Sequence, residues 1–197
     1  MADPVRETRR LSLGKGCVMR FMVDESKATD DLRHHWTETS YDGRPESWVP
    51  DIGSHWHKYH DEYMEILEGE IDFVLDGKAV TLHAGDPSLH IPKCHVHSFK
   101  FKAGVKSVLI ERTDPVGDFK EKFFEVLLDE RITDGGKPSL LSVMLSFYDG
   151  DTFLGLPGGF KLLEENLTWL LSVLGKLWAP NGPRVQPGAV PMNKKTE

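Results

Sequence analysis

Three histidines and one glutamate lie at spacings that can hold one metal ion: His55, His57, Glu62 and His97. Residues i and i+2 of a β-strand point to the same face about 7 Å apart, so His55 and His57 can face one point. Glu62 has the wrong parity to continue that strand. The polar residues between His57 and Glu62 must therefore turn the chain, so that Glu62 opens a returning strand. With His97 in a later strand, predicted over 96–102, the pattern indicates a mononuclear metal site inside a β-structure.

Three imidazoles and a carboxylate form a mixed nitrogen and oxygen ligand set. This set suits divalent Fe, Mn, Co, Ni, Cu or Zn, and the sequence does not select among them. Four protein ligands leave one or two positions open if the metal is five- or six-coordinate, and water, oxygen or a chelating substrate binds at such positions. We therefore expect one divalent metal ion per chain. Neither a P-loop nor a dinucleotide-binding glycine motif accompanies it.

The first part of this pattern resembles the first motif of the cupin superfamily. Four residues separate His57 from Glu62, and six separate Glu62 from Gly69, as in that motif. The glycine that precedes the histidines in the family is displaced, because Gly53 lies only two residues before the first histidine. The resemblance covers roughly residues 45–113. It is specific for fold and metal binding, whereas it is weak for activity, because this scaffold hosts many chemistries.

The second cupin motif is present with departures. Gly85, Pro92 and His97 match it, but one extra residue separates the glycine from the proline. Cys94 replaces a glycine of the family pattern, and Phe101 stands where the family has asparagine. None of these changes removes a ligand. The change at Cys94 affects the turn that precedes the last ligand strand.

The resemblance implies a mainly β fold, a cupin-type β-barrel (a double-stranded β-helix or jelly roll), and the change to a helical periodicity after residue 115 predicts a C-terminal helical extension. We expect residues 1–115 to form the barrel with its N-terminal strands, 116–178 the helical extension and 179–197 a flexible tail. The local patterns agree with this division. Residues 17–23 read as a strand, and the Asp76-Gly77 pair predicts a two-residue hairpin turn.

The predicted helical extension has apolar residues at helical spacing, and three kinds of surface could cover the apolar face that they form. Asp118 and Glu121 are spaced as a capping box at its start. The last predicted helix, 160–178, carries many leucines but is too short in its apolar part to span a membrane. Its apolar face can pack on the outside of the barrel, form a homodimer contact or lie on a membrane surface. We favour packing on the barrel, because apolar helix faces are most often buried.

The charge, the cysteine content and the N-terminal residues limit the classes of partner and the cellular setting that we expect. The net charge of −7 argues against nucleic acid, which requires a basic surface. Cys17 and Cys94 do not make a disulfide framework. Since the N-terminal residues lack an apolar signal core, we expect a cytoplasmic protein.

The ligand strands also predict a pocket. Inward parity points to Met64 and Ile66 beyond Glu62, and to Phe99 and Phe101 beyond the last histidine. These residues would make an apolar pocket with the metal at its base. Such a pocket favours a small organic substrate with an oxygen group, for example a phenol, enol or ketone. The alternative is that the four residues belong to the barrel core alone.

Three further residues are candidates for proton transfer. His95 shares the parity of His97, Tyr59 shares the parity of His57, and His60 lies in the turn between two ligands. Each is also consistent with a structural or solvent-facing role.

The resemblance implies a metal-dependent cupin enzyme acting on a small organic compound. We expect a non-haem Fe(II)-type oxygenase, because cupins with this ligand set include dioxygenases. The same set occurs in isomerases, lyases and decarboxylases, so a non-redox metal enzyme is the first alternative, with secondary metabolism as one setting by analogy. A non-catalytic cupin that binds a small molecule is the second alternative.

Overall fold

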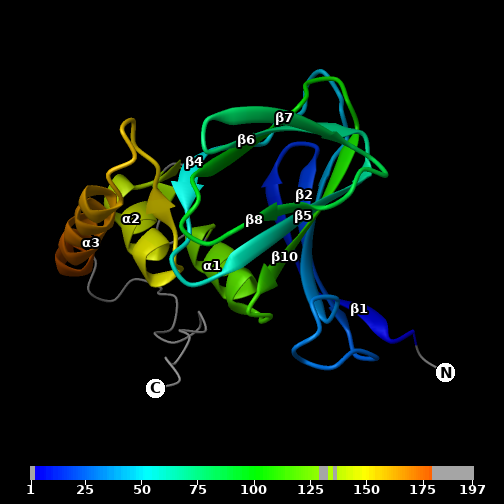
Figure 1. Ribbon diagram of the computed structural model, residues 1–197, viewed down its shortest axis with the longest axis horizontal. Helices are drawn as coiled ribbons and strands as arrows, with labels where there is room; N and C mark the ends of the chain where they lie inside the picture. Colours follow the sequence, from blue (N-terminus) through cyan, green and yellow to red (C-terminus); the bar gives the residue numbers. More distant parts are fainter. Residues whose placement is uncertain (1–2, 129–132, 135–136, 179–197) are drawn as a thin grey trace.

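The structure is a computed structural model that describes residues 3–128, 133–134 and 137–178 (Figure 1). The strands are β1 Val5–Gly14, β2 Cys17–Asp24, β3 His35–Tyr41, β4 Asp51–Trp56, β5 Asp61–Glu68, β6 Glu70–Leu75, β7 Lys78–His83, β8 Leu89–Ile91, β9 His97–Phe101, β10 Ser107–Asp114, β11 Thr133–Asp134, β12 Lys137–Pro138 and β13 Phe153–Leu154. The helices are α1 Phe119–Leu127, α2 Leu140–Asp149 and α3 Lys161–Trp178. The predicted tail, 179–197, lies outside the described residues.

Two antiparallel sheets make the barrel. In the described part of the chain the larger sheet has the order β1-β2-β3-β10-β5-β8, and the smaller has the order β13-β4-β9-β6-β7. Strands distant in sequence are neighbours in both sheets, which is the pairing of a jelly roll. Figure 1 shows the two sheets facing each other, with the helices gathered at one end. The expected mainly β barrel with C-terminal helices is confirmed.

The main hydrophobic core fills the space between the sheets. Its buried members come from both sheets: Tyr41, Met64, Ile66, Ile71, Phe73, Leu82, Ile91, Phe101 and Leu109. Alternate residues of β2 and β5 are buried, as the two-residue period of a half-buried strand requires. The sheets therefore close on an apolar interior, and the polar ligand cluster must be built into one end of it.

The β6–β7 hairpin follows its sequence prediction. Leu75 pairs with Lys78, so two residues make the turn. Asp76 and Gly77 have φ angles of 48° and 77°, both in the left-handed region that a type I′ turn requires. The predicted strand over 17–23 is confirmed as β2.

The first helix begins where expected, but its cap differs from the prediction. Asp118 is the N-cap residue of α1, yet its side chain accepts no capping hydrogen bond. The predicted capping box is therefore wrong. Glu121 instead accepts a hydrogen bond from the Thr8 hydroxyl on β1 at 2.8 Å. Phe119 and Phe123 are buried beneath the helix, which attaches α1 to the barrel.

The last helix packs through its polar and small residues. Its buried residues are Glu164, Thr168, Ser172 and Gly175, which follow one another at helical spacing along one face. Gly175 lies so close to α2 that an added Cβ would sit 2.6 Å from the carbonyl oxygen of Leu141. The apolar face of the same helix points away from the barrel, in contrast to the packing favoured from the sequence.

We predict that Gly175→Ala destabilises the protein by about 1–3 kcal/mol, because the new methyl group forces α2 and α3 apart. Alanine would otherwise stabilise a helix interior, so the sign of the effect tests the close contact. Urea unfolding measures it. Gly117→Ala is the control, since its Cβ would meet Phe119 only at an ordinary 3.4 Å. Equal stability of the two variants would contradict this packing.

Candidate metal centre

Four side chains converge between the two sheets. His55 and His57 lie at the end of β4, His97 begins the paired strand β9, and Glu62 comes from β5 in the other sheet. Their ligand atoms all lie within 4.8 Å of one another. All four side chains are buried or nearly so. The predicted ligands are thus positioned to bind one metal ion.

Strand parity separates these ligands from the residue between them. Trp56 points to the outer face of β4, where it stacks on Phe153 with ring centroids 4.6 Å apart. Its indole N–H donates a hydrogen bond to Glu164 of α3 at 2.8 Å. The same alternation therefore directs two histidines into the barrel and attaches the C-terminal helix to its outside.

Each histidine of the cluster is held through its Nδ1 atom by a backbone carbonyl. The acceptors are Gly53 for His55 at 2.8 Å, Asp151 for His57 at 2.7 Å and His95 for His97 at 3.1 Å. A carbonyl can only accept, so each Nδ1 carries the proton. In the neutral ring this leaves the Nε2 lone pair free for a metal, the usual arrangement of a histidine ligand.

The centre of the cluster has buried polar atoms that lack hydrogen bonds. Nε2 of His57 lies 3.0 Å from Glu62 Oε1, and Nε2 of His97 lies 2.9 Å from Glu62 Oε2. Neither nitrogen, nor Glu62 Oε2, has a hydrogen-bond partner within the described ranges. Lone pairs that converge in a buried space are costly unless a cation lies between them. The donor set therefore fits a divalent metal ion.

Burial and mutual charge set the protonation of the cluster. Burial lowers the pKa of His57 to about 3, and burial with the neighbouring imidazoles holds the pKa of His55 well below its usual value. Burial acts to raise the pKa of Glu62, but His57, Lys120 and His97 outweigh it and hold that pKa well below normal. Two neutral imidazoles and an ionised carboxylate are the forms that bind metal.

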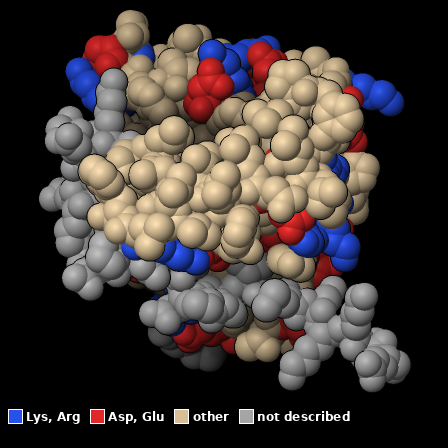
Figure 2. Space-filling model, turned by 90° about the vertical axis from the view of Figure 1, so that its left-hand side faces the viewer, with Lys and Arg blue, Asp and Glu red and all other residues tan. Residues whose placement is uncertain are grey.

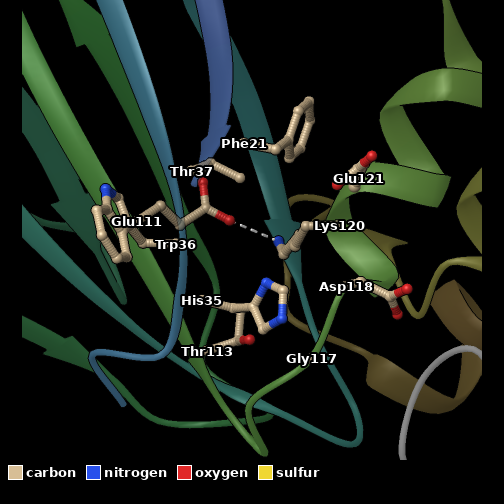
Figure 3. Close-up of a pocket in the computed structure, with 10 residues that line it drawn as sticks. All are labelled: Phe21, His35, Trp36, Thr37, Glu111, Thr113, Gly117, Asp118, Lys120 and Glu121. Carbon is tan, nitrogen blue, oxygen red and sulfur yellow. Dashed lines mark ion pairs between the residues drawn. The ribbon is translucent and has the colours of Figure 1, made fainter. Parts of the chain in front are cut away.

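Lys120 of the helix α1, which is not part of the barrel, contacts two carboxylates at the site. Its ammonium nitrogen lies 2.5 Å from Glu62 Oε1 and 2.9 Å from Glu111 Oε1. Figure 3 shows Lys120 reaching from the helix toward Glu111 on the sheet. Burial acts to lower the pKa of Lys120, but the two carboxylates raise it, so the side chain stays charged. The cavity around this pair, about 20 Å³, has room for little more than a water molecule.

Asp151 organises the turn between the ligands. It lies after α2, and its carboxylate accepts hydrogen bonds from the backbone N–H groups of Lys58 and Tyr59 at 3.0 and 2.9 Å. It also lies 2.8 Å from Nδ1 of His60. Since its carbonyl holds His57, this one residue of the C-terminal extension fixes both a ligand and the turn that follows it.

A cavity of about 450 Å³ opens onto the cluster. Its wall includes His55, His57 and Glu62 together with residues of α1 and α2. Phe99 and Phe101 also line it. The other two residues proposed for the pocket, Met64 and Ile66, lie in the core between the sheets.

The three candidates for proton transfer lie in different surroundings. His60 is buried, with Nε2 3.7 Å from Glu62 Oε1, and forms a second group of potential ligands with His57 and Asp151. Tyr59 is partly buried, next to the ammonium group of Lys58. His95 is exposed, and its Nδ1 lies 2.5 Å from Asp76 Oδ2.

Sequence analysis missed three residues of the site: Glu111, Lys120 and Asp151. A charged residue at an inward position of the apolar strand β10 was a signal for Glu111. Lys120 and Asp151 gave none, because a lysine within a helix and an aspartate after one are ordinary surface residues until the fold places them.

We predict that His57→Ala weakens metal binding by at least about 100-fold while the barrel stays folded, because a direct ligand is lost. Elemental analysis and circular dichroism measure the two properties. His34→Ala is the control, since His34 bonds the carbonyl of Asp24 and does not belong to the described cluster of candidate ligands. A full metal equivalent in the His57 variant would refute the ligand assignment.

We predict that Lys120→Met destabilises the metal-free protein by about 3–5 kcal/mol, because Glu62 and Glu111 lose their buried cation. Bound metal would supply positive charge next to Glu62, so the loss should be smaller in the metal-loaded protein. Chemical denaturation of both forms tests this. Lys122→Met is the control on the same helix, because the ion pair of Lys122 among the described residues is an exposed one with Asp118. If Lys120→Met lost no more unfolding free energy than the control, Lys120 would not be needed to compensate the charges of Glu62 and Glu111.

Comparison with known proteins gives one family and several resemblances. Residues 47–110 match the family described as cupin domain. A 49-residue stretch is 41% identical to quercetin 2,3-dioxygenase of Bacillus subtilis (strain 168), covering 25% of this chain and only 14% of that enzyme.

Solved structures resemble the chain more weakly. KdgF from Halomonas sp. is 18% identical, with a TM-score of 0.42 over 56% of this chain and 88% of that one. A predicted oxalate decarboxylase from Thermotoga maritima is 22% identical, with a TM-score of 0.41 over 57% of this chain and 95% of that one. The matched family, the two motifs and the facing antiparallel sheets agree, and the chain therefore contains a cupin domain of the cupin superfamily.

Proposed function

We propose that this protein is a metal-dependent enzyme that acts on a small organic compound, as a non-haem Fe(II)-type oxygenase. The observation that carries the proposal is the continuity of the cavity with the ligand cluster. A cavity of about 450 Å³ has three of the four candidate ligands in its wall. A site that only stabilised the fold would be enclosed by protein on every side.

The cavity suits one small molecule with an apolar body. Its volume falls within the range of about 300–1,000 Å³ that is typical of small-molecule sites. Phe99, Phe123 and Phe147 supply aromatic surface from a strand and two helices. Glu111 and Lys120 supply polar groups next to Glu62. A phenol, enol or ketone would place its ring against the phenylalanines and its oxygen toward the ligands.

The residues of the chain have separate tasks in this proposal. His55, His57, Glu62 and His97 hold the ion, and Asp151 keeps the His57 ring in its binding orientation. A bound divalent ion supplies a Lewis acid and, when it is redox-active, electrons for oxygen chemistry. The ammonium group of Lys120 can donate a hydrogen bond to a substrate oxygen at the end of the cavity. The helices α1 and α2 exclude water from one side.

The match to part of quercetin 2,3-dioxygenase supports an oxygenase. It covers a small share of that enzyme, so it supports a class of chemistry and leaves the substrate open. The ligand set is compatible with the same class, because a mixed nitrogen and oxygen set with space beside it can hold Fe(II) as well as other divalent metals.

A second candidate is a metal-dependent isomerase, lyase or decarboxylase. The observation that favours it is the Lys120–Glu111 pair, which places a proton donor and a proton acceptor 2.9 Å apart in the cavity wall. Such pairs serve reactions that move protons on a substrate without oxygen. A non-catalytic role in binding a small molecule is the third outcome that the experiment below distinguishes.

The experiment loads metal-free protein with Fe(II) or with Zn(II) and supplies phenolic and diketone compounds with and without oxygen. We expect oxygen uptake in step with substrate loss for the Fe(II) form alone, and none for His57→Ala. Product formed without oxygen by the Zn(II) form would reject the oxygenase and favour the second candidate. Binding without product in every form would reject both enzymes.

A cavity-filling variant tests where the substrate binds. Leu127 lies on α1 in the cavity wall, away from the ligands. Leu127→Trp should raise KM by at least about tenfold, because its ring occupies space that the substrate needs, while metal content stays unchanged. Unchanged kinetics would place the substrate elsewhere.

A further inference from the structure

The outer face of α3 is unusual for a helix of a monomeric protein. Seven of its large apolar residues are exposed: Leu162, Leu163, Trp169, Leu170, Leu174, Leu177 and Trp178. We call these seven residues the apolar face of α3. They lie opposite the polar and small residues that pack against the protein. Figure 2 shows the corresponding side of the molecule as a broad uncharged surface with charged groups at its margins.

This face is large enough to form an interface. Trp169 and Trp178 are 48% and 80% exposed, and Phe160 just before the helix is 69% exposed. At about 150–250 Å² per aromatic side chain, these three leave about 400 Å² in water. The five exposed leucines extend the surface beyond the largest patch of a typical monomer, about 300–600 Å². It approaches the roughly 800 Å² that each partner buries in a standard interface.

The charged residues of α3 are all engaged with the body of the protein. Among the described contacts, Glu164 bonds Trp56 and Glu165 pairs with Lys58 at 2.5 Å. Lys161 lies over the Trp56 ring at 4.7 Å. Lys176 lies 3.6 Å from Asp149. The exposed side of the helix is thus left without charge, so that an identical surface can meet it without repulsion.

Residue spacing on the face also favours a helix as its partner. Leu163, Asn166, Leu170, Val173 and Leu177 alternate in steps of three and four residues. This repeat forms the seam along which two helices pack in a coiled-coil arrangement. Asn166 is the polar exception in the seam, and one polar seam residue commonly fixes the alignment of paired helices.

From these observations we propose that the apolar face of α3 binds the same face of a second copy of this chain, forming a two-fold homodimer. A lipid surface is the weaker occupant. Membrane-surface helices carry lysine and arginine toward the lipid headgroups, whereas both lysines of α3 contact its own protein, and the net charge of −7 opposes anionic lipid. Among the described helices none is long and apolar enough to cross a membrane. The proposal is independent of the proposed enzyme activity.

Sedimentation equilibrium of the full-length protein tests the proposal. We expect a dimer for the wild type and at least about a tenfold increase in the dissociation constant for Leu170→Glu, because the interface would bury two unpaired carboxylates. Leu67→Glu is the matched control, since Leu67 on β5 and Leu170 are both 49% exposed. It should remain a dimer. Unchanged circular dichroism and metal content would show that both variants are folded.

Three results would overturn the proposal. A monomeric wild type at concentrations up to about 100 µM is the first. A dimer that survives Leu170→Glu is the second, because it would assign the contact to another surface. The third is a monomer that sediments with phosphatidylserine-containing vesicles and loses this property in Leu170→Glu, which would assign the face to lipid.

Cross-linking tests the contact directly. Leu170 lies at the middle of the seam, so it faces its own copy in a parallel pair and lies nearest the two-fold axis in an antiparallel pair centred on the seam. In a Cys94→Ser background, which removes the exposed native thiol, Leu170→Cys should give a covalent dimer with a short bismaleimide. Leu67→Cys should not. Equal cross-linking of the two variants would reject the interface.

Discussion

The structure depends on the need to compensate one buried carboxylate. Glu62 is 1% exposed, and an ion in such a place is unstable unless opposite charge and hydrogen-bond donors surround it. The helical extension supplies the Lys120 ammonium group at 2.5 Å, whereas His57 and His97 face the carboxylate at 3.0 and 2.9 Å with Nε2 atoms whose lone pairs are free. A divalent ion would complete this balance. The same polar group therefore explains why the centre can bind metal and why Lys120 joins α1 to it.

The C-terminal extension thus belongs to the candidate site as much as the barrel does. Asp151, 94 residues from His57 in the chain, holds that ligand by its carbonyl and the following turn by its carboxylate. The helices α1 and α2 provide one wall of the cavity, so the space for a substrate is shaped by both parts. A barrel without these helices would keep its four ligands but lose the positioning of one of them and the enclosure of the cavity.

The third helix, α3, is attached to the barrel by a polar contact. Glu164 accepts a hydrogen bond from Trp56, which lies between two ligands on the opposite face of β4. This arrangement turns the small and polar residues of α3 inward, with Gly175 against α2, and the leucines outward. A helix held in this way can be positioned by the barrel while its apolar face is free to meet another surface. Trp56 is therefore one direct connection between the strand that carries two candidate ligands and the helix α3.

Local spacing along the chain is enough to predict some parts of this structure. The two-residue period of β4 puts His55 and His57 on one side, and the Asp76-Gly77 pair sets the hairpin turn, because strand pleating and left-handed φ angles are properties of neighbouring residues. The periodicity of α3 identified its apolar face, but not the side that the barrel covers. The packing of the helices on the barrel sets which side is covered, and the same packing brings Lys120, Glu111 and Asp151 to the ligands. Pairing between distant charged groups depends on how the sheets and helices pack, and packing leaves no regular period in the sequence.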